Sequence, residues 1–189
     1  MTRQSILIAT GVIILAIIVA AVLVYNAGPS HGAVQNASHS PIVGKAALNK
    51  TAPQFEVATT AGLFDLSKTH KPVFLEVFAT WCPHCQRMTS VVDRLYGRYE
   101  SRVDFIGVSG SNTGMDGTSA SSELDVLDWV RRFNVRYPVA YDPILNVANL
   151  YLQGGFPTFV IIDTNKKVRY LNTGELSFNE LDNAIRKVL

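Results

Sequence analysis

Cysteine is scarce in this 189-residue chain, which contains only Cys82 and Cys85. A scaffold of structural disulfides is excluded, because neither cysteine has any other partner within the chain. The same scarcity argues against a structural zinc site, since such a site uses four protein ligands and no second Cys/Cys or Cys/His pair is present. The chemistry of the two cysteines therefore depends on the pair itself and on its surroundings.

Charge is also sparse, at 17% of the residues with a formal net charge of +2. The basic residues are scattered, so the sequence offers no positive patch for a nucleic-acid partner. One stretch, Ile6 to Val24, has no charged side chain at all. About 20 residues at a rise of 1.5 Å each match a bilayer core of roughly 30 Å, so this stretch predicts one transmembrane helix at about residues 6–24.

A cleaved signal peptide and a buried core helix are the two alternatives to that anchor. The apolar run is longer than the roughly 7–15 residues of a signal-peptide core, and no clean small-x-small cleavage site follows it. Arg3 precedes the run, and no Lys or Arg follows until Lys45. The positive-inside rule then predicts a single-pass protein of the cell membrane, with a cytoplasmic N-terminus and the rest on the periplasmic or extracellular face.

The chain after the anchor (residues 1–25) divides into a linker and a domain. Residues 26–45 are rich in Gly, Pro, Ser, Asn and Ala with few large apolar side chains, which is typical of a flexible linker. Residues 46–189 are long enough for one compact domain. In this domain predicted strands alternate with predicted helices, which favours an α/β fold with a central mixed sheet flanked by helices.

The stretch from Val73 to Met88, VFLEVFATWCPHCQRM, organises this domain. Val73 to Ala79 consists of β-branched and aromatic residues around a single acid, Glu76, and predicts a strand buried on both faces. From Cys85 onward the apolar side chains recur at helical spacing, at Met88, Val92, Leu95 and Tyr99. The cysteines therefore lie where a buried strand gives way to a helix.

This position suits redox chemistry. Cys82 is expected at the helix N-terminus, where unpaired N–H groups and the helix dipole favour a negative charge. Cys85 follows three residues later on the same face, within reach of a disulfide bond. Two thiols so placed can alternate between a dithiol and a Cys82–Cys85 disulfide, with Cys82 biased toward the reactive thiolate.

Further elements are expected on both sides of this stretch. Short strands around a turn are predicted at 52–57 and 63–66, and further strands at 103–108, 137–141, 158–163 and 168–171. Residues 109–122 are rich in Ser, Gly, Asn and Thr and predict an exposed loop. Ser122 with Asp125, and Ser177 with Glu180, have capping-box spacing at the starts of two helices, and 144–152 predicts a third.

The domain resembles the thioredoxin-fold proteins, and specifically the membrane-anchored TlpA/ResA-type thiol–disulfide oxidoreductases. Five segments carry the resemblance in the family's order and together cover essentially 46–189: APQF, FLEVFATWCPHC, VDFIGVS, YPVAYDP and GGFPTFVIID. The resemblance implies a central sheet flanked by helices, with the Cys-x-x-Cys motif on the first helix after the core strand. It also implies catalysis without a bound cofactor.

The resemblance assigns roles around the cysteine pair. Cys82 matches the exposed attacking cysteine and Cys85 the buried resolving one. Glu76 matches the buried acid beneath the active site, and Trp81 the tryptophan beside the pair. Glu76 has an alternative interpretation, as a charge satisfied by hydrogen bonds with no part in catalysis.

A second set of residues concerns substrate and redox tuning. Pro157 matches the family's cis-proline, so Phe156, Pro157 and Thr158 are expected to hold the substrate chain, although an ordinary loop proline is the alternative. Pro83 and His84, between the cysteines, form the dipeptide of the strongly oxidising DsbA-type proteins. A His at the helix start can favour the Cys82 thiolate, which makes the disulfide more oxidising. The domain lacks the large helical insertion of DsbA, and the direction of the reaction stays open.

The sequence therefore predicts an enzyme that exchanges disulfides with client proteins outside the cytoplasm and is recycled by a membrane redox partner. In the reducing direction, Cys82 attacks a client disulfide and Cys85, deprotonated with help from Glu76, releases the reduced client. Two alternatives belong to other classes: a membrane-held metal-binding or delivery module that uses the cysteine pair, and an adaptor whose cysteines are incidental. No metal site is predicted.

Overall fold

The computed structural model describes residues 44–189. The predicted transmembrane helix at 6–24 and all but the last two residues of the predicted linker lie outside the described residues. Among residues 44–189, no helix combines the length and apolar character needed to cross a membrane.

From β3 to β6 strands and helices alternate, as the sequence predicts, whereas strands follow one another at β1–β3 and at β6–β7. The elements in chain order are β1 (Glu56–Thr59), β2 (Gly62–Asp65), β3 (Val73–Phe78), α2 (Pro83–Tyr99), β4 (Asp104–Ser109), α3 (Glu123–Arg132), β5 (Val139–Tyr141), α4 (Asn146–Tyr151), β6 (Thr158–Ile162), β7 (Val168–Thr173) and α5 (Phe178–Arg186).

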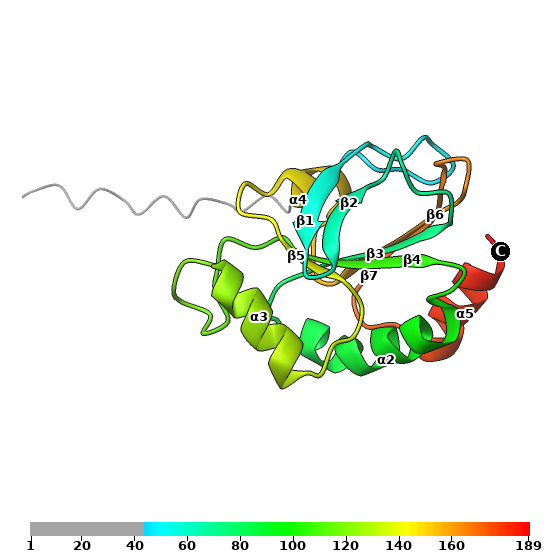
Figure 1. Ribbon diagram of the computed structural model, residues 1–189. Coiled ribbons are helices and arrows are strands. Elements are labelled where there is room, and N and C mark those ends of the chain that lie inside the picture. The colour runs from blue at the N-terminus through cyan, green and yellow to red at the C-terminus, as the bar shows by residue number, and fades with distance from the viewer. Residues whose placement is uncertain (1–43) are drawn as a thin grey trace, which may run out of the picture. The chain divides into compact units, whose positions relative to one another are not determined.

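The described strands form one seven-stranded sheet in the order β2-β1-β5-β4-β3-β6-β7. The central strands β3, β4 and β5 run parallel, whereas β6 pairs with β3, and β1 with β5, in antiparallel fashion. The sheet is therefore mixed, which confirms the prediction. Parallel neighbours need a crossover, and α2 and α3 provide the crossovers after β3 and β4 (Figure 1).

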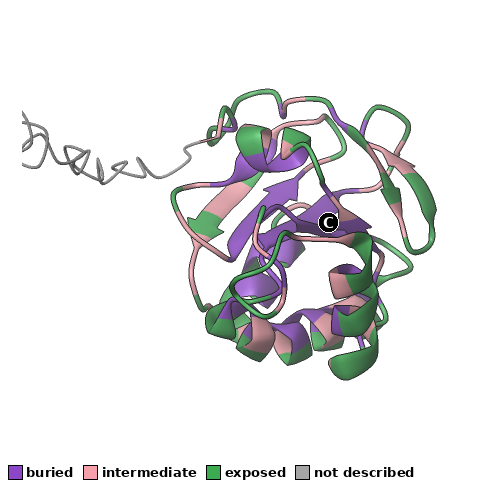
Figure 2. Ribbon diagram, turned by 90° about the vertical axis from the view of Figure 1, so that its left-hand side faces the viewer, coloured by how far each residue is buried: buried purple, intermediate pink, exposed green. Residues whose placement is uncertain are grey.

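Both faces of the sheet are covered, because successive side chains of a strand point to opposite sides. On β3, Phe74 and Phe78 belong to the core beneath α2, α3 and α5. Leu75 and Val77 belong to the second core, which packs against α4. Figure 1 shows the same division of helices between the two faces, and Figure 2 shows the central strands buried between them. Glu76 shares the face of Phe74 and Phe78, and this places its carboxyl on the side of α2.

The loop expected to be exposed at 109–122 is buried at its start. Ser109 ends β4, and Gly110 and Ser111 are buried as well. A side chain at Gly110 would place its Cβ 2.8 Å from the Cβ of Ala148 on α4. Close packing of α4 against the chain therefore requires glycine here, and it draws the first residues of the loop inward.

Candidate active site

The cysteine pair lies at the junction that the sequence predicts, between the end of β3 and the start of α2. Cys82 is the N-cap of α2 with extended backbone (φ −76°, ψ 118°), and its side chain makes no capping hydrogen bond. Pro83 follows at the first helical position, where its missing N–H costs nothing. Cys85 lies in the first turn, and both cysteines are free thiols. The unpaired N–H groups of this helix end favour a negative charge on Cys82.

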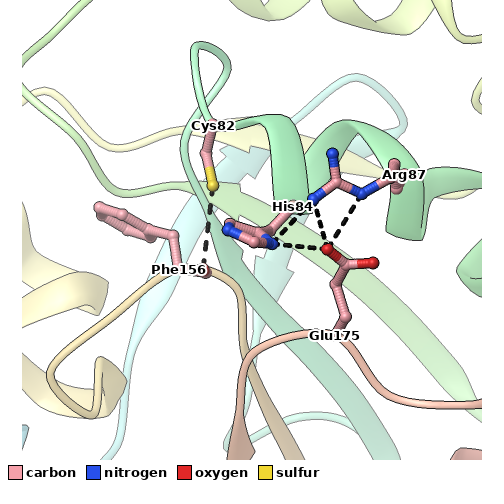
Figure 3. Close-up of polar contacts among 5 residues, drawn as sticks. All are labelled: Cys82, His84, Arg87, Phe156 and Glu175. Carbon is pink, nitrogen blue, oxygen red and sulfur yellow. Dashed lines mark hydrogen bonds and ion pairs between the residues drawn. The ribbon is translucent and has the colours of Figure 1, made fainter.

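Cys82 is buried, with 4% of its surface exposed, and this corrects the expectation of an exposed attacking cysteine. The reason is the loop before β6, whose Phe156 carbonyl oxygen lies 3.8 Å from Cys82 Sγ (Figure 3). Cys85 has no exposed surface at all. Burial raises the pKa of the Cys85 thiol, and the negative charge of Glu76 raises it further. A base must therefore accept the Cys85 proton before that thiol can attack.

The expected substrate-binding residues surround Cys82. The Phe156–Pro157 peptide bond is cis, which agrees with the position implied by the family resemblance. Thr158 is buried at the start of β6, and its hydroxyl donates to the Gly155 carbonyl at 2.9 Å. The ring of Phe156 meets the ring of Trp81 edge-on, with centroids 6.2 Å apart. These residues build an aromatic wall beside the nearly covered sulfur.

Trp81 is the more exposed part of that wall, at 37% of its surface. Its indole N–H donates to Ser111 Oγ at 2.8 Å, and the Ser111 hydroxyl also accepts from the backbone N–H of Thr113 at 3.1 Å. The buried start of the loop after β4 thus fixes the orientation of Trp81. Sequence reasoning did not single out Ser111, because serine is common in loops and its partner lies 30 residues away.

Glu76 is completely buried beneath the pair. The hydroxyl of Tyr137 donates to its Oε2 atom at 3.1 Å, and Oε1 has no partner among the described residues. Burial raises the pKa of Glu76 to about 8, although the hydrogen bond from Tyr137 acts in the opposite direction. This carboxyl can therefore hold or release a proton near neutral pH, as a proton acceptor for Cys85 requires.

Tyr137 reaches Glu76 because the β4 residue at the point of contact is a glycine. Gly107 pairs with Glu76 in the β3–β4 register, and a Cβ on Gly107 would lie 3.0 Å from Cε2 of Tyr137. The sequence places Tyr137 in a predicted strand; in the structure it lies just before β5 and is buried. Its role as partner of Glu76 could not be predicted, because the two residues are 61 positions apart.

His84 has partners that the sequence did not predict. Its Nδ1 atom lies 2.5 Å from Oε1 of Glu175, and the same oxygen accepts from Arg87 Nε at 3.0 Å (Figure 3). Arg87 is three residues after His84 on α2, a spacing that could have signalled contact. Glu175 lies between β7 and α5, and no local pattern indicates it.

The described part of the chain contains no group of three or more His, Cys, Asp or Glu side chains arranged to hold a metal ion. The chemistry that residues 44–189 bring together consists of two thiols, one buried carboxyl and a cis-proline loop.

A free Cys-x-x-Cys pair at the first helix after the core strand, facing a cis-proline, defines the class of thioredoxin-like thiol–disulfide oxidoreductases. Comparison with known proteins agrees: a sequence model of the Redoxin family matches residues 47–185. The chain belongs to the Redoxin family, and within it the expected likeness to TlpA/ResA-type oxidoreductases is confirmed.

Individual relatives support this assignment. The chain is 29% identical to the thiol–disulfide oxidoreductase ResA of Bacillus cereus over 149 residues, which cover 76% of this chain and 80% of that protein. It is 28% identical to ResA of Geobacillus thermodenitrificans, over 75% of this chain and 78% of that protein. The crystal structure of a thiol:disulfide interchange protein, DsbE from Chlorobium tepidum, is similar in fold, with a TM-score of 0.66 and 23% identity. That similarity covers 76% of this chain and 98% of the other.

Proposed function

We propose that this protein exchanges disulfides with client proteins through Cys82 and Cys85 on the extracytoplasmic side of a membrane. One observation carries the proposal. Cys82 lies at the N-terminus of α2 against the carbonyl before a cis-proline, while Cys85 is sealed behind it on the side of the buried Glu76. In this arrangement Cys82 is the thiol that reacts with the client, and Cys85 is the thiol that completes the reaction.

In the reducing direction, the Cys82 thiolate attacks one sulfur of a client disulfide. A bond forms between Cys82 and that sulfur, and the other client sulfur leaves as a thiolate. Cys85 then gives its proton to the Glu76 carboxylate and attacks Cys82. This step forms the Cys82–Cys85 disulfide and releases the second client thiol. The oxidising direction reverses both steps, so the client gains the disulfide that the protein loses.

The surroundings of the pair support these roles. The backbone before Pro157 lies against Cys82 Sγ, where the strand of a client could pair with the partly exposed backbone of the cis-proline loop at Gly155 and Phe156. Glu76 has a pKa of about 8, near enough to neutrality to accept a proton and return it. The Cys85 thiol, whose pKa burial raises, needs such an acceptor.

The location outside the cytoplasm is part of the proposal. It rests on the uncharged stretch from Ile6 to Val24 and on the placement of Arg3 before it, with no basic residue after it until Lys45. An oxidising compartment also allows a cysteine pair to pass through a stable disulfide. We further propose that a membrane redox partner returns the pair to its starting state after each exchange.

Reduction of insulin with dithiothreitol as electron donor tests the activity. We expect the full-length protein, purified in a mild detergent, to accelerate the cleavage of insulin disulfides, because Cys82 relays electrons from dithiothreitol to insulin. The double variant Cys82→Ser, Cys85→Ser lacks both thiols and changes each by a single atom, so it serves as the control once circular dichroism shows that it is folded. A rate no higher than that of dithiothreitol alone, or an equal rate in the double variant, would contradict the proposal.

A further inference from the structure

Glu175 connects the loop after β7 to the active-site helix. Its Oε1 atom lies 2.5 Å from Nδ1 of His84, accepts from Nε of Arg87 at 3.0 Å, and also accepts from Nη2 of Arg87. Figure 3 shows the histidine and the arginine turned toward this one carboxylate oxygen. Nδ1 of His84 also lies 2.9 Å from Nη2 of Arg87, which can only donate, so the carboxylate and the guanidinium both contact this nitrogen and its role as donor or acceptor depends on the tautomer.

Cys82 receives none of these hydrogen bonds. Among the described residues, Cys82 Sγ donates to the Phe156 carbonyl, and neither His84 nor Arg87 donates to the sulfur. Both groups nevertheless lie close to it along the chain, two and five residues into α2. The charge of Cys82 is one of the smaller causes that raise the pKa of Arg87, after the hydrogen bond to Glu175. Arg87 is thus within electrostatic reach of the thiolate.

Positive charge near Cys82 favours its thiolate, and a favoured thiolate makes the disulfide more oxidising. A carboxylate bound to the Arg87 guanidinium offsets part of that positive charge. We propose that Glu175 is a positioning residue that restrains His84 and Arg87, and so makes the Cys82–Cys85 disulfide less oxidising than its Cys-Pro-His-Cys sequence implies. This inference rests on the proposed thiol–disulfide exchange and gives it a direction, toward reduction of clients.

The carboxylate is available for this role throughout the neutral range. Its hydrogen bonds from Arg87, and then from His84, lower the pKa of Glu175 to about 2. The three side chains are 59%, 55% and 40% exposed for His84, Arg87 and Glu175. Solvent therefore screens the cluster, and the expected effect is that of an exposed ion pair rather than of a buried one.

Equilibration of the full-length protein with glutathione measures the effect. In this reaction one protein disulfide and two glutathione thiols give one protein dithiol and one glutathione disulfide, so electrons and protons balance. We expect Glu175→Gln to raise the equilibrium constant about two- to fivefold, because the Arg87 guanidinium, no longer paired with a carboxylate, stabilises the Cys82 thiolate. The fraction of free thiol, measured by acid quenching and alkylation, gives the constant.

Two further variants isolate the cause. Glu56→Gln removes the same charge from the exposed surface of β1 and should leave the constant unchanged. In the sheet, β5 and β4 separate β1 from β3, the strand that precedes α2. The triple variant His84→Gln, Arg87→Gln, Glu175→Gln also lacks the Arg87 guanidinium and the His84 ring, and should lose the gain of the single variant.

The inference is overturned if Glu175→Gln leaves the constant unchanged or lowers it, or if the triple variant keeps the gain. Failure of the wild-type pair to equilibrate with glutathione at all would be a different result. It would overturn the proposed exchange reaction, and this inference with it.

Discussion

At the scale of single residues, the buried acid Glu76 carries an electrostatic conflict in the interior of the described domain. Its place on β3 follows from the alternation of the strand, which turns it toward α2 with Phe74 and Phe78. A charged carboxylate in this setting is costly, and one hydrogen bond from Tyr137 does not remove the cost. The group is therefore retained at the expense of stability, which is expected of a residue that transfers protons.

The conflict predicts how the stability of the protein depends on pH. The pKa of Glu76 is about 8 in the folded protein against 4.5 for the ordinary group, so the folded state binds the extra proton between these values. Stability must then fall as pH rises from about 4.5 to about 8. A shift of this size corresponds to a loss on the order of 5 kcal/mol across the window.

Glu76→Gln tests this directly, because glutamine keeps the acceptor for Tyr137 but cannot ionise. We expect the variant to lose much less stability than the wild type between pH 5 and pH 8.5. Urea unfolding followed by tryptophan fluorescence measures it, since Trp81 and Trp129 both lie in the folded domain. Parallel pH curves for the two proteins would show that Glu76 stays ionised or is solvated, contrary to the account.

At the scale of elements, the helix starts show how local sequence fixes the frame of the site. Ser122 caps α3 with a complete capping box, in which its hydroxyl accepts from the N–H of Asp125 and the Asp125 carboxylate accepts from the N–H of Ser122. At α5, Ser177 accepts from the N–H of Glu180, but the Glu180 carboxylate accepts from the Tyr170 hydroxyl. Only the first half of the second capping box therefore forms.

Ser122→Ala should lower the free energy of unfolding by about 1 kcal/mol, because it leaves an N–H group at the start of α3 without its partner. Its neighbour provides a matched control. The hydroxyl of Ser121 is buried and has no hydrogen-bond partner among the described residues, so Ser121→Ala should cost far less. Urea unfolding of the two variants side by side decides the matter. An equal loss in both would mean that the cap contributes nothing specific.

The elements that bear the chemistry were predictable because their signals are local. The buried run of β3, the glycine- and proline-marked turns, and the apolar stripe of α2 each occupy one short window of sequence. Their ends were less certain: the strand expected at 137–141 covers only Val139–Tyr141, and the helix expected at 144–152 covers Asn146–Tyr151. The residues at the ends of these elements are held by tertiary contacts, such as that of Tyr137 with Glu76. Such contacts join residues too far apart to occur in one short window of sequence.

The contacts that tune the site were not predictable for the same reason. Cys82, Cys85, Glu76 and Pro157 could be placed through their motifs and the family resemblance. Glu175 could not, because it lies 91 residues from His84 and 88 residues from Arg87 in the sequence. Its contacts with them depend on where the end of β7 lies relative to α2. An acidic residue before a helix is ordinarily interpreted as a surface charge that favours the helix N-terminus.

At the scale of the whole molecule, the described domain is organised around the junction of β3 and α2. The two cores on opposite faces of the sheet hold β3 rigidly, and β3 holds the start of α2. The loop before β6 returns to this point and covers Cys82, so a client must approach beside Trp81 and Phe156. With the proposed anchor at residues 6–24, this entrance would face proteins outside the cytoplasm.

The separation of roles between Cys82 and Cys85 is the centre of this account, and trapping of mixed disulfides in cells tests it most directly. A full-length Cys85→Ser protein with a tag after Leu189 should accumulate client proteins bound to Cys82 in the membrane fraction, because the resolving thiol is missing. A membrane-impermeant reductant added to intact cells should release them. Cys82→Ser should trap few or none, since Cys85 has no exposed surface, whereas Cys82 keeps 4% of its own and lies against the cis-proline loop. Equal trapping by the two variants, or complexes that the reductant cannot reach, would contradict the assigned roles or the assigned side of the membrane.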